Sequence, residues 1–84
     1  MDLLKAIQKS FPKIEKLFTQ QQLIEFKNTK INDLTYYQSG LGTMIKIKIL
    51  KPKSALKRLF IEKGITNTDI MTLILINLFH SYVR

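Results

Sequence analysis

The residues able to support acid–base or nucleophilic chemistry are few in this chain of 84 residues. His80 is the single histidine and there is no cysteine, so the sequence offers no histidine cluster or thiolate to bind a metal, and no thiol nucleophile. Asp69 precedes His80 by three helical turns, about 16 Å on an intact helix, which is too far for a catalytic dyad. The sequence therefore predicts a protein that is not an enzyme and has no metal site and no cofactor.

The other polar groups also lack the neighbours that catalysis requires. Ser10 and Ser39 have no candidate base close to them in sequence. Gly40-Leu41-Gly42 lacks the third glycine and the Lys-Thr pair of a phosphate-binding loop. The acidic residues are scattered, at Asp2, Glu15, Glu25, Asp33, Glu62 and Asp69. His80 is expected on the polar side of the last helix, as a solvated residue rather than a base.

Charge is the strongest functional signal in the sequence, because the chain has 14 Lys and Arg but only 6 Asp and Glu, for a net charge of +8. No acid occurs between Asp33 and Glu62, and that interval holds the candidate partner-binding residues Lys46, Lys48, Lys51, Lys53, Lys57 and Arg58. Such a surface attracts phosphate and acidic partners over about 8–10 Å in cellular salt. The chain is also rich in isoleucine, as an AT-rich genome would encode, so lysine as a mere solubilising residue is the alternative explanation.

The first thirty residues read as three short helices. Asp2 can cap a helix over 2–10, and Ser10-Phe11-Pro12 starts a second one, because serine caps well and proline suits a first turn. Thr19 followed by Gln22 has the spacing of a capping box and predicts a third helix as far as Phe26.

The segment 31–50 is ambiguous. Its apolar residues recur at helical spacing, at Leu34, Tyr37, Leu41, Ile45 and Ile49. Residues 45–49, however, alternate perfectly between isoleucine and lysine, which is a strand pattern. No second alternating run exists to pair with such a strand, and an isolated hairpin is marginal. We therefore favour a helix over 31–49, with strand as the alternative.

Two further helices complete the expected fold. One begins at Lys53 or Ser54 and ends at Gly64, a good left-handed stop. The last runs from about Asp69 to Tyr82 and is apolar over more than half its circumference. This favours a central position in the core, and the alternative is that part of this helix forms an interface with another molecule. The sequence thus predicts an all-α fold, a single compact domain over 1–84, with four to five helices around a central hydrophobic C-terminal helix.

No stretch approaches the roughly 20 apolar residues that span a bilayer. The longest, residues 70–79, is interrupted by Thr72 and Asn77, and the first residues lack the layout of a signal peptide. We therefore expect a reduced, cytoplasmic protein without a membrane partner.

Residues 26–83 also carry a series of short motifs: Lys27-Asn28-Thr29, Asp33-Leu34, Gly40-Leu41-Gly42 with Ile45, Gly64-Ile65, Asp69, Met71 and Phe79-His80. In these motifs the chain resembles a family of small bacterial all-helical domains of unknown function. The family has His, Arg and Asn where this chain has Gln38, Lys46 and Ile47. The resemblance implies a helical fold whose glycines allow close helix contact, in a bacterial or phage protein. It implies no function, and a function that needed the family's His and Arg would be lost or altered here.

The leading functional hypothesis is a non-enzymatic protein-interaction module of the inhibitor, immunity or regulatory type. It would bind an acidic-faced protein partner through spare apolar surface on the last or the first helix, rimmed by lysines. The alternative is non-sequence-specific nucleic-acid binding by the basic segment 46–58, through the phosphate backbone, because lysines rather than arginines dominate it. A structural homodimer is the third hypothesis.

Overall fold

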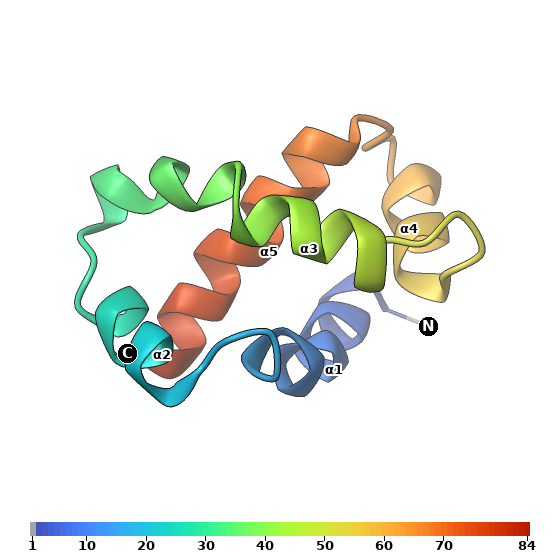
Figure 1. The fold of residues 1–84 in the computed structure, drawn as a ribbon. Helices are drawn as coiled ribbons and strands as arrows, with labels where there is room; N and C mark the ends of the chain where they lie inside the picture. The colour runs from blue at the N-terminus through green and yellow to red at the C-terminus, as the bar shows by residue number, and fades with distance from the viewer. Residues whose placement is uncertain (1) are drawn as a thin grey trace.

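Short helices make up the whole regular structure of the protein. A computed structural model describes residues 2–84, and in them five α-helices and one 3₁₀ helix follow one another without a strand (Figure 1). Their bounds are α1 Leu3–Glu15, α2 Gln20–Lys27, the 3₁₀ helix η1 Ile31–Gln38, α3 Leu41–Lys48, α4 Ala55–Glu62 and α5 Thr68–Val83. The all-α prediction is confirmed, with six elements in place of the expected four to five.

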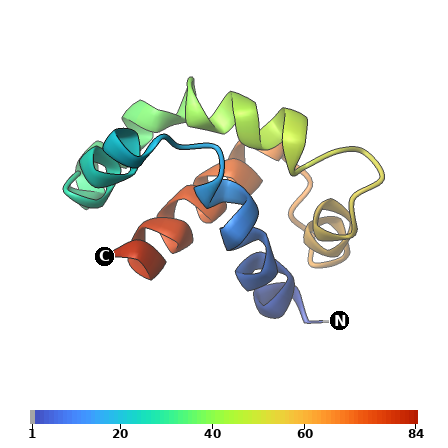
Figure 2. The ribbon, with the colours of Figure 1, turned by 60° about the horizontal axis from the view of Figure 1, so that its bottom comes forward.

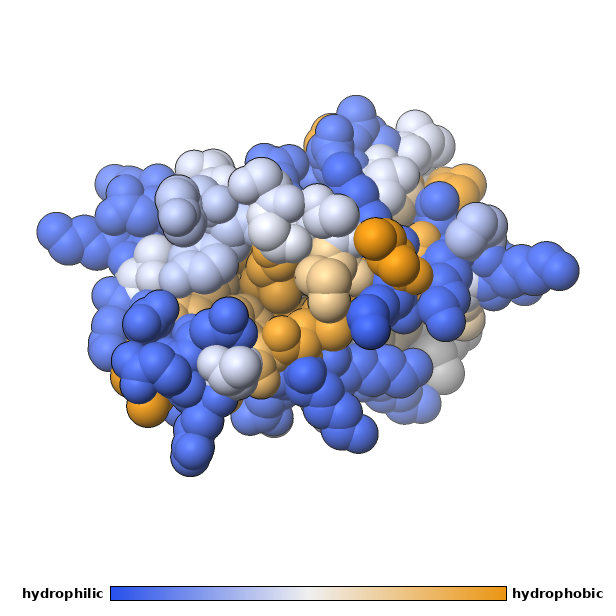
Figure 3. Space-filling model, viewed as in Figure 1, coloured by the Kyte–Doolittle hydropathy of each residue, from blue (hydrophilic) through white to orange (hydrophobic). Residues whose placement is uncertain are grey.

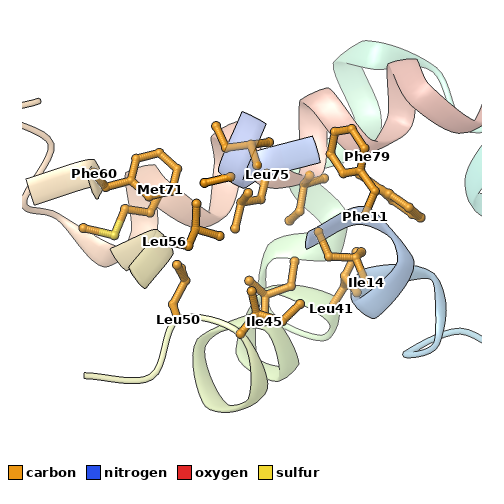
Figure 4. Packing of buried hydrophobic residues seen from close by; sticks show 14 of the residues in the cluster. Phe11, Ile14, Leu41, Ile45, Leu50, Leu56, Phe60, Met71, Leu75 and Phe79 are labelled. Atoms are coloured by element: carbon orange, nitrogen blue, oxygen red, sulfur yellow. The ribbon is translucent and has the colours of Figure 1, made fainter. Parts of the chain in front are cut away.

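Helix α5 is the centre of the fold. It runs diagonally through the molecule and contacts η1, α3, α1 and α2. In Figure 1, η1 and α3 lie above it and α1 and α2 below it, and Figure 2 shows that α2 lies beside η1. Four of its apolar side chains are fully buried, Met71, Leu75, Ile76 and Phe79. Figure 4 shows how the core residues of α1, α3 and α4 point toward them. A helix this apolar on most sides is stable only when it is surrounded, so the predicted central position is confirmed.

Helix α1 corrects the expectation of two helices that meet at Ser10. It is continuous from Leu3 to Glu15, with Pro12 inside it. Proline lacks an N–H and leaves the carbonyl of Gln8 without its helical partner, but Gln8 is exposed and water can solvate it. Phe11 and Ile14 are buried on either side of Pro12. Their burial favours a straight continuation, and Ser10, the expected cap, instead donates its hydroxyl to the Ile7 carbonyl inside the helix.

The ambiguous segment is helical, as expected, but it is divided. Ser39 and Gly40 separate η1 from α3. Leu34, Leu41, Ile45 and Ile49 are buried, as the helical spacing predicts, whereas Ile47 is 62% exposed. Gly42 is buried against α5, and a Cβ placed on it would lie 3.0 Å from the Thr72 Cγ2 atom. The close helix contact implied by the resemblance is therefore present at Gly42, and Gly40 has open space around it.

Local capping signals are formed largely as the sequence indicates. Thr19 and Gln22 make both bonds of a capping box, the Thr19 N–H donating to Gln22 Oε1 at 2.9 Å and the Gln22 N–H donating to Thr19 Oγ1 at 3.2 Å. Ser54 Oγ accepts the Lys57 N–H at the start of α4. Gly64 follows α4 with a φ of 85°, the left-handed geometry that glycine adopts without strain. Asp2 stands at the start of α1 without a side-chain cap bond.

Candidate interaction surfaces

The six basic residues predicted to bind a partner lie on α3, on α4 and on the connection between them. Lys46 pairs with Asp69 at the start of α5, and this is the one ion pair among residues 2–84. The side chain of Lys57 is half-buried. The other four are exposed: Lys48, Lys51, Lys53 and Arg58. Lys46 therefore has a structural partner, and the other five remain available to bind an external group.

A cleft of about 240 Å³ joins this segment to α1. We call it the basic cleft, and its lining residues are Ala6, Lys9, Ser10, Lys13, Ile49, Ser54, Ala55 and Leu56. No acidic side chain lines it. Its floor is aliphatic, because Ala6, Ile49 and Leu56 are all buried core residues. The cleft can attract negative charge and at the same time accept a small apolar side chain.

Lys9 and Lys13 were not among the predicted site residues. Both are exposed, and α1 turns them toward the connection between α3 and α4. A signal for them exists in the sequence, since Lys5, Lys9 and Lys13 recur every four residues and so share one side of a helix. The prediction missed it because it grouped basic residues that are neighbours in sequence, whereas the cleft combines two segments about forty residues apart.

The apolar surface left over on α5 is smaller than the sequence suggests. Of its large apolar residues, only Ile70 and Tyr82 are exposed, at 50% and 58%. Tyr82 lies against Phe11 of α1, with ring centroids 4.7 Å apart. The two helices border a second cleft of about 280 Å³, lined by Leu4, Gln8, Phe11, Leu78, Ser81 and Tyr82. Helix α5 thus uses most of its apolar surface in the core of its own chain.

Apolar side chains are also exposed on the side of the molecule that Figure 1 shows. Figure 3 shows them gathered along the boundary between the upper and the lower helices, with hydrophilic residues on both sides. A third cleft, of about 310 Å³, lies there and is lined by Leu17, Phe18, Gln22, Glu25, Tyr36, Tyr37, Gly40 and Leu41. Because Glu25 lines it, this cleft is a poorer match for an acidic partner than the basic cleft.

His80 is placed differently from the prediction of a solvated residue. It is 1% exposed and packs edge-on against Phe26, with ring centroids 5.2 Å apart. Its Nε2 atom is buried and has no hydrogen-bond partner. The position on the helix suggested solvent, but α2 and η1 also pack on α5 and enclose this side of it. Among residues 2–84, no three His, Cys, Asp or Glu side chains form a group that could hold a metal ion.

The fold and these surfaces define the class of the protein. It is a small, basic, all-helical domain that carries several clefts on its surface. The chain belongs to the family described as Domain of unknown function (DUF6794), whose model matches residues 5–83. This agrees with the expectation of a family without an assigned function. None of the curated proteins and none of the solved structures matches the chain. Among the helices of residues 2–84, none combines the length and apolar character needed to cross a membrane.

Proposed function

We propose that this protein is a non-enzymatic protein-interaction module, of the inhibitor, immunity or regulatory type, and that its basic cleft binds a partner with an acidic face. The single observation that supports this most is the composition of the cleft. Lys9 and Lys13 line it on α1, Ile49 and Ser54 line it at the two ends of the α3–α4 connection, and no acid lines it. Lys51 and Lys53 are exposed on that connection, although they do not line the cleft themselves. Opposite potentials speed the encounter of two proteins and select against like-charged partners.

The aliphatic floor of the cleft favours protein over nucleic acid. Proteins that bind single strands stack bases on aromatic rings, and readers of duplex sequence rely heavily on arginine. No aromatic residue and no arginine lines the basic cleft. Ile49 and Leu56 form an apolar base beneath the lysines, the arrangement of an anchor pocket with a charged rim in protein interfaces.

Non-specific nucleic-acid binding through the segment 46–58 is the second candidate. The observation that favours it is that Lys48, Lys51, Lys53 and Arg58 are exposed and have no acidic partner among residues 2–84. This mode has a distinct signature, because log affinity falls linearly with log salt by about 0.9 per phosphate neutralised on duplex DNA.

Site-specific photo-crosslinking tests the proposal. A photoreactive amino acid is placed at Ala55, which lines the basic cleft and is exposed, or at Gln21 on α2 as the matched control. Crosslinking is carried out in a lysate of the source cells, with and without nuclease treatment. We expect one discrete protein adduct from Ala55 and not from Gln21, and identification of the crosslinked peptide should reveal an acidic segment.

Charge reversal completes the test. Lys9→Glu with Lys13→Glu should abolish the adduct, whereas Lys16→Glu with Lys63→Glu, an identical change in net charge at exposed lysines outside the cleft, should preserve it. Equal loss in both double variants would mean that only the overall charge matters. Adducts that disappear with nuclease would replace the proposal with the nucleic-acid alternative, which the salt dependence of duplex binding would then measure.

A further inference from the structure

A second cationic cavity is lined by the end of α2, the connection from α2 to η1 and the end of α5. These segments lie at the end of the molecule opposite α4 (Figures 1 and 2). Its volume is about 450 Å³, against about 240 Å³ for the basic cleft. We call it the anion pocket, and it is lined by Lys27, Asn28, Thr29, Lys30, Ile31, Asn32 and Arg84. Three of these seven residues are basic and none is acidic.

The cations of the anion pocket have no acidic partner among residues 2–84. Lys27 is the last residue of α2, and Arg84 directly follows α5. The carbonyl end of a helix carries a partial negative charge that favours nearby cations. The same partial charge opposes an anion, so the three basic side chains must supply the attraction, and none of them has an acidic partner that competes for its donors.

The backbone that carries the lysines is firmly attached to the core. Thr29 donates its hydroxyl to the Glu25 carbonyl at 2.9 Å, and its Oγ1 lies 3.2 Å from the Tyr37 hydroxyl. Tyr37 in turn packs edge-on against the fully buried Phe26, with ring centroids 5.0 Å apart. The loop between α2 and η1 is therefore held from two sides, and a held loop loses less entropy when it binds a ligand.

From these features we infer that the anion pocket binds a small molecule that carries two or more phosphate groups. One phosphate group carries a charge of about −1.5 to −2 at neutral pH, which is less than the charge of the three basic side chains. The charge of two phosphate groups balances these three side chains better. Arginine can bind phosphate through two parallel N–H bonds, while lysine acts as a point charge. Asn28 and Asn32 add amide donors, and the volume lies in the range of small-molecule sites.

Titration of the isotope-labelled protein with inorganic pyrophosphate, followed by NMR, tests the inference. Orthophosphate and citrate at equal ionic strength serve as comparison ligands. We expect saturable shifts of the backbone amides of residues 27–32, at lower concentrations for pyrophosphate than for either comparison ligand. Lys27→Gln with Lys30→Gln should weaken pyrophosphate binding about tenfold. Lys16→Gln with Lys63→Gln, the same loss of charge at two exposed lysines that line neither the anion pocket nor the basic cleft, should leave the affinity unchanged.

Each alternative result overturns the inference. Shifts spread over lysines throughout the chain, without saturation, would show charge screening and no site. Citrate binding as tightly as pyrophosphate would contradict the preference for phosphate. Arg84→Lys, which keeps the charge and removes the fork of donors, should also weaken binding, and an unchanged affinity would contradict the two-bond phosphate contact on which the inference rests. A duplex DNA that shifts the same amides far more strongly would identify the pocket as part of a nucleic-acid surface.

Discussion

The contact between Gly42 and Thr72 determines how closely α3 approaches α5, and Gly42→Ala tests it. The new Cβ would lie 3.0 Å from Thr72 Cγ2, closer than two carbon atoms normally pack. Thr72 is fully buried, and its hydroxyl donates to the Thr68 carbonyl at 2.8 Å, so its side chain cannot rotate away without losing that bond. The two helices would have to separate, and the contact of Leu41 and Ile45 with the core would loosen.

The expected size of the effect follows from two opposing terms. Overpacking in a core costs about 1–3 kcal/mol. Alanine in place of glycine in a helix returns no more than about 1 kcal/mol, and less in a first turn such as the one that holds Gly42. We expect Gly42→Ala to reduce the free energy of unfolding by about 1 kcal/mol, which is about 4–8 °C in melting temperature for a domain of this size.

Thr72→Ser provides the decisive comparison, because it removes the opposing methyl group and keeps the hydroxyl. By itself it should cost about 1 kcal/mol through the loss of one buried methyl. When Gly42→Ala is combined with Thr72→Ser, the added alanine should become neutral or stabilising, so urea unfolding of the four proteins should give a coupling energy of about 1–2 kcal/mol. Single effects that add within about 0.5 kcal/mol would refute the steric argument.

Three further changes test other parts of the fold by thermal or urea unfolding. His80→Leu should stabilise the protein by about 1 kcal/mol, because it removes a buried nitrogen that has no hydrogen-bond partner, although the aromatic contact with Phe26 is lost. A loss of stability would mean that Nε2 is solvated or paired in solution. Gly64→Ala should cost about 1 kcal/mol despite open space around it, because the φ of 85° strains any other residue, and an unchanged melting temperature would contradict a left-handed helix end. Pro12→Ala should stabilise by as much as about 3 kcal/mol, because it restores an N–H for the Gln8 carbonyl; no gain would imply that α1 is already broken at that point.

The features that were predictable from the sequence are those that a few neighbouring residues decide. The capping box of Thr19 and Gln22 closes within four residues, and the cap of Ser54 and the helix end at Gly64 are equally local. The helical spacing of Leu34, Leu41 and Ile45 was also predictive, because a helix that must bury one side does so in almost any helical fold.

The features that were missed depend on contacts between distant segments. Proline at position 12 normally suggests a boundary, but Phe11 and Ile14 pack into a core that the local sequence does not reveal. The polar character of His80 predicts exposure, and the coverage of α5 by α2 and η1 overrides it. For the same reason Lys9 and Lys13, the two lysines that line the basic cleft, were not predicted, since they approach the connection between α3 and α4 only in three dimensions.

The two cationic surfaces are expected to act independently of each other. The molecule extends over 34 Å along its longest axis. Helix α4, which lines the basic cleft, lies toward one end, and the end of α5, which lines the anion pocket, lies toward the other (Figure 2). Electrostatic interaction in cellular salt decays over about 8 Å, so a charge change at one end is largely screened at the other. The net charge of +8 must still weaken the fold through self-repulsion, with a single ion pair among residues 2–84 to offset it. Charge changes confined to one of the two surfaces should therefore leave binding at the other unchanged, and parallel losses at both would show a single diffuse attraction to polyanions.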